Sequence, residues 1–322
     1  MRRSGFHRLS RPLTLALVVL LLAGVAAASL IWRLEQTDLS SLRAHATIEA
    51  ANHAKSLERG IDRALSATYS LAAMVRQGNG VVRDFDAVAN EMLPFYPGAA
   101  SLQLAPRGVV RSVVPLAGNE QAIGHDLLQD PARNKAAFLA RDTGKLTLDG
   151  PFDLLQGGVG AVGRLPVFLD DAGGRSFFWG FTSVLIRFPV VLEATRFIEL
   201  PEQGLAWELW RSHPDTGKKL IIAASSPVAL IDPVEATLQV PNSAWILSVA
   251  PVDGWHRSPY IWIRITAGLL FSLLLAYLTK LLADANAHEK KLETLVDERT
   301  ADLVAREADL NRAQSIARVG SW

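Results

Sequence analysis

The sequence contains no cysteine, which excludes disulfides, thiol catalysis, iron–sulfur clusters and cysteine-ligated zinc. Its net charge is only +1, and no basic cluster is interleaved with aromatic residues, so nucleic-acid binding has no support. The 7 histidines are scattered without metal-ligand spacing, and neither G-x-S-x-G nor H-E-x-x-H occurs. These absences predict a chain without a catalytic centre, a cofactor or a metal site.

Charge is missing from one long stretch near the N-terminus. Leu13 to Trp32 is a run of 20 uncharged residues, about the length that crosses a bilayer as a helix. The basic residues before it (Arg2, Arg3, Arg8 and Arg11) predict that residues 1–12 lie in the cytoplasm. The alternative is a cleaved signal peptide, because Ala26, Ala27 and Ala28 offer small residues at a possible cleavage site.

A second apolar run covers residues 260–282. Trp255, Tyr260 and Trp262 lie at its first end and Lys280 at its other end, a pattern typical of a helix anchored at both membrane interfaces. Two spans would place residues 33–259 outside the cytoplasm. That segment is far longer than a connection needs and is therefore predicted to be a folded domain held at a lipid bilayer.

Proline is absent from residues 33–77, and Gly60 is the only glycine there. Apolar residues recur at three- and four-residue spacing, which predicts one long helix that ends at Gly78-Asn79-Gly80, a stalk over residues 33–80. Such a helix either packs against its twin in a homodimer or covers a sheet of its own domain.

The rest of the domain predicts an α+β fold. In residues 81–200 the expected order is a helix from an Asp84 N-cap to Leu93, a hairpin over 101–114, a helix opened by Asp130-Pro131, three antiparallel strands and a helix over 188–197. This order suggests a PAS-like unit. Residues 201–259 predict a smaller unit of two hairpins, with strands at 204–211, 218–224, 234–240 and 245–251.

The most informative stretch is 145–168, which reads K-L-T-L-D-G-P-F-D-L-L-Q-G-G-V-G-A-V-G-R-L-P-V-F. It predicts two β-runs, the first broken at Asp149-Gly150-Pro151, joined by a glycine-rich turn. Gly157, Gly158, Gly160 and Gly163 mark either a tight hairpin or a loop that closes on a ligand. The match to G-x-G-x-x-G is rejected as a dinucleotide fingerprint because a β-type run follows it.

Three polar residues in this stretch are the best candidates to contact a ligand: Asp149, Gln156 and Arg164. Arg164 suits a carboxylate or phosphate, but an ion pair to Asp149 or Asp153 across the hairpin is an equal alternative. His125 and Asp126 precede a predicted helix, and for Asp126 a role at the start of that helix is favoured over ligand binding.

Beyond Lys280 the chain is charged and helical. Leu292, Val296, Leu303 and Leu310 fit alternating spacings of four and three, with Arg299 and Arg306 at the seam positions between them. This pattern predicts a signalling helix or coiled coil over residues 283–314 and hence a homodimer.

The stretch over 144–168, together with S-L-Q-L-A-P-R-G-V-V-R-S-V-V-P-L upstream, resembles the CHASE family of extracellular sensory domains. The resemblance implies two PAS-like lobes on a stalk helix, flanked by membrane helices, with a small-molecule ligand in the membrane-distal lobe. Its pocket strands would correspond to Asp149, Gly150, Pro151, Phe152, Leu154, Gly163, Arg164, Leu165, Pro166 and Phe168. Plant members hold an adenine-type ligand with an acidic residue. Near its expected place this sequence reads Leu116-Ala117-Gly118-Asn119-Glu120, with no aspartate, so an adenine-type ligand is not expected.

The tail, A-Q-S-I-A-R-V-G-S-W, is similar to the opening of a PAS domain in bacterial signalling proteins, which would begin at residues 315–322. These resemblances imply the input half of a receptor in the bacterial inner membrane with a periplasmic sensor. They favour a cyclic-di-GMP cyclase or phosphodiesterase as the output, with a histidine kinase as the alternative. Neither activity would reside in these residues. A dimerisation module without a ligand and a tethered enzyme are the competing interpretations.

Overall fold

The computed structural model describes residues 11–131, 134–154, 158–213, 216–255 and 260–319. They form two compact units, a helical unit from residues 1–39 and 257–322 and a sheet unit from residues 40–256. Two long helices and two antiparallel sheets make up the chain, which confirms the predicted α+β class.

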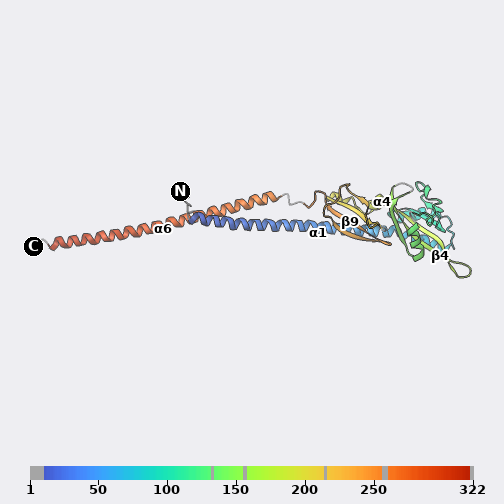
Figure 1. The fold of residues 1–322 in the computed structure, drawn as a ribbon, viewed down its shortest axis with the longest axis horizontal. Coiled ribbons are helices and arrows are strands. Elements are labelled where there is room, and N and C mark those ends of the chain that lie inside the picture. The colour runs from blue at the N-terminus through green and yellow to red at the C-terminus, as the bar shows by residue number, and fades with distance from the viewer. Residues whose placement is uncertain (1–10, 132–133, 155–157, 214–215, 256–259, 320–322) are drawn as a thin grey trace, which may run out of the picture. The chain divides into compact units, whose positions relative to one another are not determined.

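The helical unit contains the first part of α1 (Arg11–Gln77) and all of α6 (Ile261–Val319), drawn in blue and in orange to red in Figure 1. Each is long and apolar enough, by length and composition, to cross a membrane. Near the start of α6, Arg264 Nη1 lies 3.0 Å from Glu35 Oε1 and 2.9 Å from Asp38 Oδ2 on α1. Arg264 therefore has a structural role within this unit.

The first lobe of the sheet unit, here called the five-stranded lobe, has strand order β2-β1-β5-β4-β3, with every pair antiparallel. Its helices are α2 (Phe85–Met92), α3 (Asn134–Thr143), α4 (Phe188–Ala194) and α5 (Glu199–Glu202), and short 3-10 turns cover Leu93–Phe95 and Glu120–Ala122. Its strands are β1 (Ala99–Pro106), β2 (Ser112–Val114), β3 (Thr147–Asp153), β4 (Val159–Asp170) and β5 (Ser176–Arg187).

The second lobe, here called the four-stranded lobe, has the order β7-β6-β9-β8, again antiparallel. Its strands are β6 (Leu205–Ser212), β7 (Lys219–Ala224), β8 (Val234–Val240) and β9 (Ser243–Pro251), which agrees with the predicted pair of hairpins.

Helix α1 covers both sheets of this unit. A stripe of its residues from Ala46 to Val75 is fully or almost fully buried in one core shared with strands of both lobes. Of the two interpretations of the stalk, covering its own sheets is therefore the one observed. The helix approaches β4 so closely that a Cβ added to Gly163 would lie 2.1 Å from Leu65 Cδ2, which explains a glycine at that position.

Several local predictions were wrong. Strand β3 runs through Asp149-Gly150-Pro151 with a register shift instead of breaking, because its pairing with β4 resumes at Phe152. Gly160 and Gly163 lie inside β4 and not in a turn. Asp84 precedes α2 but makes no side-chain cap hydrogen bond, because its backbone is left-handed at φ 50°.

Two helix boundaries also differ. The third predicted helix is described from Asn134, with Asp130 accepting a backbone hydrogen bond from Asn134 at 2.8 Å, while residues 132 and 133 lie outside the described part. The helix predicted over 188–197 ends at Ala194, because Arg196 takes a left-handed conformation at φ 60°.

Candidate functional site

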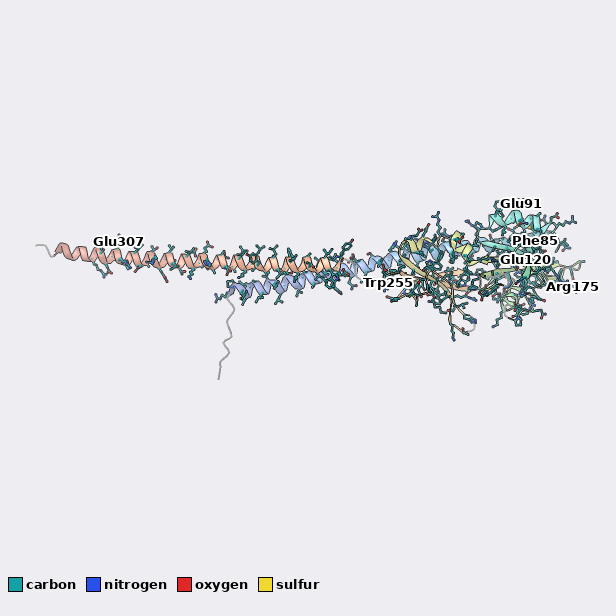
Figure 2. All side chains as sticks on the ribbon, turned by 90° about the horizontal axis from the view of Figure 1, so that it is seen from above. Phe85, Glu91, Glu120, Arg175, Trp255 and Glu307 are labelled. Atoms are coloured by element: carbon teal, nitrogen blue, oxygen red, sulfur yellow. The ribbon has the colours of Figure 1, made fainter. Side chains whose placement is uncertain are left out.

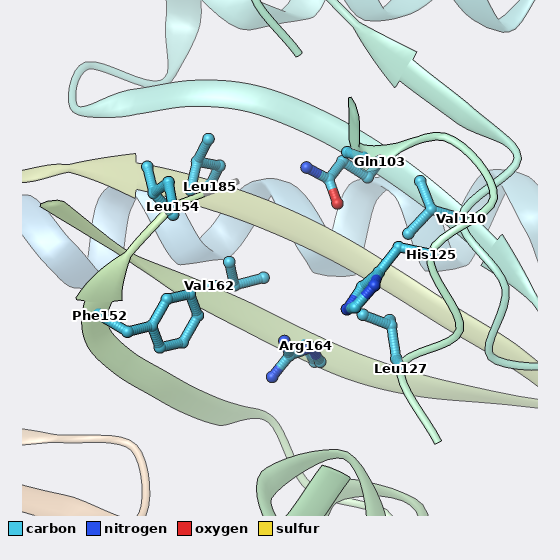
Figure 3. A pocket seen from close by; sticks show the side chains of 10 residues that line it. Gln103, Val110, His125, Leu127, Phe152, Leu154, Val162, Arg164 and Leu185 are labelled. Atoms are coloured by element: carbon cyan, nitrogen blue, oxygen red, sulfur yellow. The ribbon is translucent and has the colours of Figure 1, made fainter. Parts of the chain in front are cut away.

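A small cavity lies in the five-stranded lobe, on the face of the sheet that points away from α1 (Figure 3). Its volume is about 30 Å³, room for about two water molecules. Strands β1, β3, β4 and β5, with Leu154 just after β3, supply one wall, and the segments on either side of β2 supply the other. The lining residues are Gln103, Val110, Ala122, His125, Leu127, Phe152, Leu154, Val162, Arg164 and Leu185.

Alternation along β4 decides which side chains reach this cavity. Successive residues of a strand point to opposite faces, so Val162 and Arg164 point into the cavity while Gly163 and Leu165 point to α1. The expectation that Gly163 and Leu165 line the same pocket as Arg164 is therefore wrong for this cavity. They belong to the core that the sheet shares with the helix.

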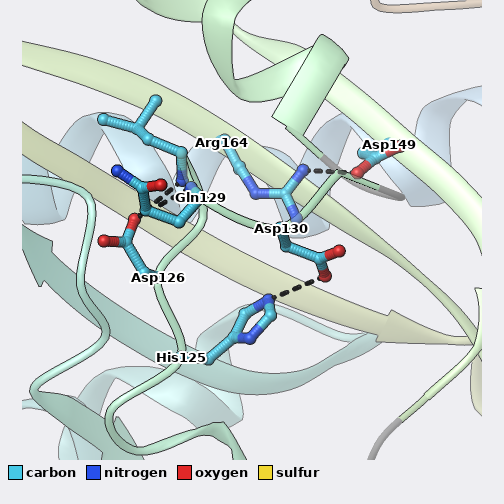
Figure 4. Close-up of polar contacts among 7 residues, drawn as sticks. His125, Asp126, Gln129, Asp130, Asp149 and Arg164 are labelled. Atoms are coloured by element: carbon cyan, nitrogen blue, oxygen red, sulfur yellow. Dashed lines mark hydrogen bonds and ion pairs between the residues drawn. The ribbon is translucent and has the colours of Figure 1, made fainter.

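Arg164 is the central polar residue of the site. It is only 1% exposed, and its Nη1 donates a hydrogen bond of 2.7 Å to Asp149 Oδ2 (Figure 4). Its Nε has no hydrogen-bond partner among the described residues. A buried charge needs both a counter-ion and satisfied donors, and Arg164 has the first but lacks the second. The predicted ion pair across the hairpin is thus formed with Asp149.

The loop opposite the sheet carries a second polar pair. His125 Nε2 lies 3.4 Å from Asp130 Oδ2 (Figure 4). Asp126 Oδ1 accepts backbone hydrogen bonds from Leu128 at 2.9 Å and Gln129 at 3.2 Å. Asp126 therefore shapes the turn before α3, in agreement with the structural role favoured for it, while His125 turns its ring to the cavity.

The other predicted site residues are dispersed. Phe152 and Leu154 line the cavity, and Asp149 contacts it through its ion pair with Arg164. Gly150 and Pro151 continue β3, and Pro166 continues β4 beyond the cavity. Gln156 lies outside the described residues. The Phe168 ring stacks edge-on with the Phe178 ring at 5.7 Å, and the Asn119 side chain donates a hydrogen bond of 2.9 Å to the Pro115 carbonyl. Neither Phe168 nor Asn119 is among the residues that line the cavity.

Seven of the ten lining residues were not predicted as site residues from the sequence. Gln103 on β1 and Leu185 on β5 reach the site because the register places Gln103 opposite Ser183, and Ser183 opposite Arg164. Val110 and Leu127 come from the covering loop. Alternation along β1 and β5 is visible in the sequence, but the order of the strands in the sheet is not.

Strand β3 also connects the site to the four-stranded lobe. The Leu148 N–H donates a 2.7 Å hydrogen bond to Asn242 Oδ1 in the turn between β8 and β9. Next to it, Asp149 acts on Arg211 of β6: burial lowers the pKa of the Arg211 guanidinium, and the Asp149 charge opposes that shift. Asp149 thus interacts with one arginine in each lobe.

A family model described as the CHASE domain matches residues 67–221. Residues 67–221 form a CHASE domain. The match begins in the last part of α1, includes the whole five-stranded lobe and ends in β7, so the cavity around Arg164 lies entirely within it. This confirms the resemblance to a family of sensory domains.

The CHASE segment is part of a chain that is also similar to solved structures. An extracellular ligand binding receptor from Desulfohalobium retbaense aligns with a TM-score of 0.45 and 15% identity, over 66% of this chain and 40% of the receptor. The Vibrio cholerae LuxQ periplasmic domain aligns with a TM-score of 0.30 and 16% identity, over 71% and 98%. Likenesses this weak carry no conclusion about this chain. No curated protein matches it.

Proposed function

We propose that this chain is the input part of a transmembrane receptor whose CHASE domain binds a small molecule at the cavity around Arg164. Membership of a sensory family gives the class of function, and the cavity is the place in the five-stranded lobe where buried polar and apolar groups converge. Helices α1 and α6 would be the two membrane spans, with the sheet unit outside the cytoplasm.

The observation that carries the proposal is the unpartnered Nε of Arg164. Leaving a buried donor unsatisfied costs about 1–3 kcal/mol, more for a charged group, and folded proteins rarely keep such a donor without a use. A ligand that presents an acceptor oxygen to this nitrogen would satisfy it.

The side chains that line the cavity restrict the chemical class of the ligand. Phe152, Leu154, Val162 and Leu185 are apolar, so the ligand would combine an apolar part with a carboxylate or carbonyl oxygen directed at Arg164. A cavity of about 30 Å³ is far below the roughly 300 Å³ of ordinary ligand pockets, so such a ligand must displace part of the wall. The segments 107–111 and 115–131, on either side of β2, supply the covering wall and are not strand.

Strand β3 would pass the binding event to the second lobe. A ligand oxygen on Arg164 would compete with Asp149, whose charge also acts on Arg211, and the neighbouring Leu148 N–H bonds to the four-stranded lobe. Binding shifts a conformational equilibrium only by the difference in affinity between the two states, so this competition supplies the difference that signalling requires.

The cytoplasmic side of the proposal rests on sequence. Leu292, Val296, Leu303 and Leu310 are each more than 60% exposed on α6, which suits a coiled coil with a second copy of the chain. We propose that this helix leads to a PAS domain and then to an enzyme, a cyclic-di-GMP cyclase or phosphodiesterase, with a histidine kinase as the alternative. Expressing the longer gene product and assaying both activities tests this part.

Thermal unfolding of the full chain in phosphatidylcholine nanodiscs tests the ligand site. A library of small carboxylates and purines should contain a compound that stabilises the protein by RT ln(1 + [L]/Kd), about 2.7 kcal/mol at one hundred times Kd. Arg164→Met should abolish the shift, whereas Lys219→Met, a cation of the four-stranded lobe, should retain it. If the shift survives in Arg164→Met, the site lies elsewhere. If no compound in a broad library shifts the transition, the structural dimerisation module becomes the better interpretation.

A further inference from the structure

The four-stranded lobe carries an exposed apolar patch that the ligand site does not use. Val228, Ile231 and Val252 are 73%, 74% and 65% exposed. Val228 and Ile231 lie in the segment between β7 and β8, and Val252 follows β9. Large aliphatic side chains exposed as a group, unlike single ones, mark a surface that contacts something.

The patch surrounds an apolar hollow. All three residues line a cavity of about 370 Å³ together with Leu205, Ala206, Ala229, Leu230 and Pro251. The exposed side chains are therefore continuous with a concave aliphatic surface and are not isolated.

The chain enters and leaves the sheet unit at the end of the unit that carries this patch. Arg43, near the first residue of the unit, stacks on the Trp255 ring at 4.7 Å and pairs with Asp232. The Trp255 indole Nε1 donates to the backbone carbonyls of Ile231 at 3.1 Å and Asp232 at 2.9 Å. Trp255 lies at the end of the unit opposite Glu120 and Arg175 (Figure 2). Ile231 is thus bound to the residues at which the chain enters and leaves the domain.

We propose that Val228, Ile231 and Val252 insert into the surface of the phospholipid bilayer and fix the domain on it. This inference rests on the proposed membrane anchoring through α1 and α6. Residue 43 follows the apolar run that ends at Trp32 by 11 residues, and residue 255 precedes α6 by 6. Residues 32–43 belong to α1, which rises about 1.5 Å per residue, and the link from residue 255 to α6 spans at most about 3.3–3.6 Å per residue, so both connections allow this end of the domain to lie within about 20 Å of the bilayer.

The charges around the patch indicate the charge of the lipid headgroups that it contacts. Arg43 and Asp232 neutralise each other, and Asp253 stands next to Val252. No excess of basic residues is present among these groups, so attraction to anionic headgroups does not contribute, and apolar insertion into a zwitterionic phosphatidylcholine surface is the matching chemistry.

The natural absence of cysteine allows a direct test in the full chain. Ile231→Cys is spin-labelled in phosphatidylcholine nanodiscs, and its accessibility to oxygen, which concentrates in lipid, is compared with that to a nickel chelate, which stays in water. Leu22→Cys in the apolar run of α1 is the lipid reference. Phe95→Cys, 77% exposed in the five-stranded lobe, is the water reference. The expected result is an oxygen-to-nickel ratio at 231 shifted from the value at 95 towards that at 22, and unchanged when phosphatidylserine is added.

The other outcomes overturn the proposal in distinguishable ways. A water-like ratio at 231 with a lipid-like ratio at 22 disproves insertion but leaves the anchoring intact. Low accessibility to both reagents at 231 means that the patch is covered by protein, such as a second copy of the chain. A water-like ratio at 22 means that the anchoring itself is wrong.

Discussion

The two lobes of the sheet unit are built alike on one face and differently on the other. Each antiparallel sheet packs one face on α1. In the five-stranded lobe the second face is covered by α3 and by the segments on either side of β2, whose side chains form a further apolar cluster with it. In the four-stranded lobe the sheet carries a polar layer of its own there: Trp210 Nε1 donates to Ser248 Oγ at 2.8 Å, and Ser248 Oγ to Glu235 at 3.2 Å.

This difference explains why the ligand site is proposed in one lobe only. A second layer takes Arg164 and its partner out of water, with 2% of the Arg164 side chain exposed, so electrostatic interactions there are strong. The corresponding cation on the open sheet, Lys219, pairs with Glu208 at 2.9 Å with 45% of its side chain exposed. An ion pair beneath a covered sheet therefore interacts more strongly with a ligand, and can discriminate between ligands better, than an ion pair exposed to water.

The largest contrast between the lobes is expected on removing these cations. Arg164→Met leaves Asp149 without its partner beneath a covered sheet and should destabilise the fold by about 3–5 kcal/mol. Lys219→Met removes a cation whose side chain is 45% exposed, but its partner Glu208 is only 9% exposed and loses its ion-pair partner, so this change should cost less than Arg164→Met, about 1–3 kcal/mol. Denaturant unfolding of both variants measures the difference.

The double variant Asp149→Leu/Arg164→Met is the control for this comparison, because it removes both charges together. Replacing a buried pair by apolar groups is often close to neutral, so most of the loss should be recovered. If Arg164→Met and Lys219→Met cost the same, the two environments do not differ as described.

A second contrast concerns how tightly α1 contacts the five-stranded sheet. Gly163→Ala places a Cβ against Leu65, which is 1% exposed and cannot turn to solvent, and should cost about 1–3 kcal/mol. Leu65→Ala alone creates a cavity and should cost about 2–5 kcal/mol. In Gly163→Ala/Leu65→Ala the new methyl group enters that cavity, so thermal unfolding should show less destabilisation than the sum. Strict additivity would contradict the close approach.

The same residues show what the sequence could predict. Period-two and helical patterns located nearly every strand and helix, because these patterns are local. The ion pair between Asp149 and Arg164 was among the alternatives because both belong to one hairpin. The role of Gly163 was missed, since the atom that requires a glycine there belongs to Leu65, nearly one hundred residues earlier.

The remaining part of the site depends on sheet order. Gln103 and Leu185 face Arg164 only because β5 lies between β1 and β4. Neither composition nor spacing encodes that order, so the lining residues from β1 and β5 could not be predicted.

A third test addresses the link between the lobes. Asn242 is left-handed at φ 58° and accepts from the Leu148 N–H. Asn242→Gly keeps that backbone conformation and removes only the acceptor, so it should cost about 1 kcal/mol, and the Leu148 amide should exchange its hydrogen faster. Asp84→Gly, at another left-handed position whose side chain makes no cap hydrogen bond, controls for the flexibility of glycine. Unchanged exchange at Leu148 would show that the lobes are held together by other contacts.

The smallest effect is expected where α1 contacts the four-stranded lobe through a charge. The pKa of Glu58 is lowered, first by the hydrogen bond from Lys55 and then by the Gln239 backbone N–H, which donates to Glu58 Oε2 at 3.1 Å. A carboxyl group whose pKa falls on folding stabilises the protein above its unfolded pKa, about 4.3, and loses this contribution as the pH falls through the folded value. Glu58→Gln keeps an acceptor for Gln239 but carries no charge. The difference in melting temperature between the natural protein and Glu58→Gln should therefore be small and constant at neutral pH and should shrink as the pH falls below the unfolded pKa of about 4.3. A difference that persists in acid would mean that the glutamine disturbs packing, and that the charge of Glu58 does not stabilise this contact.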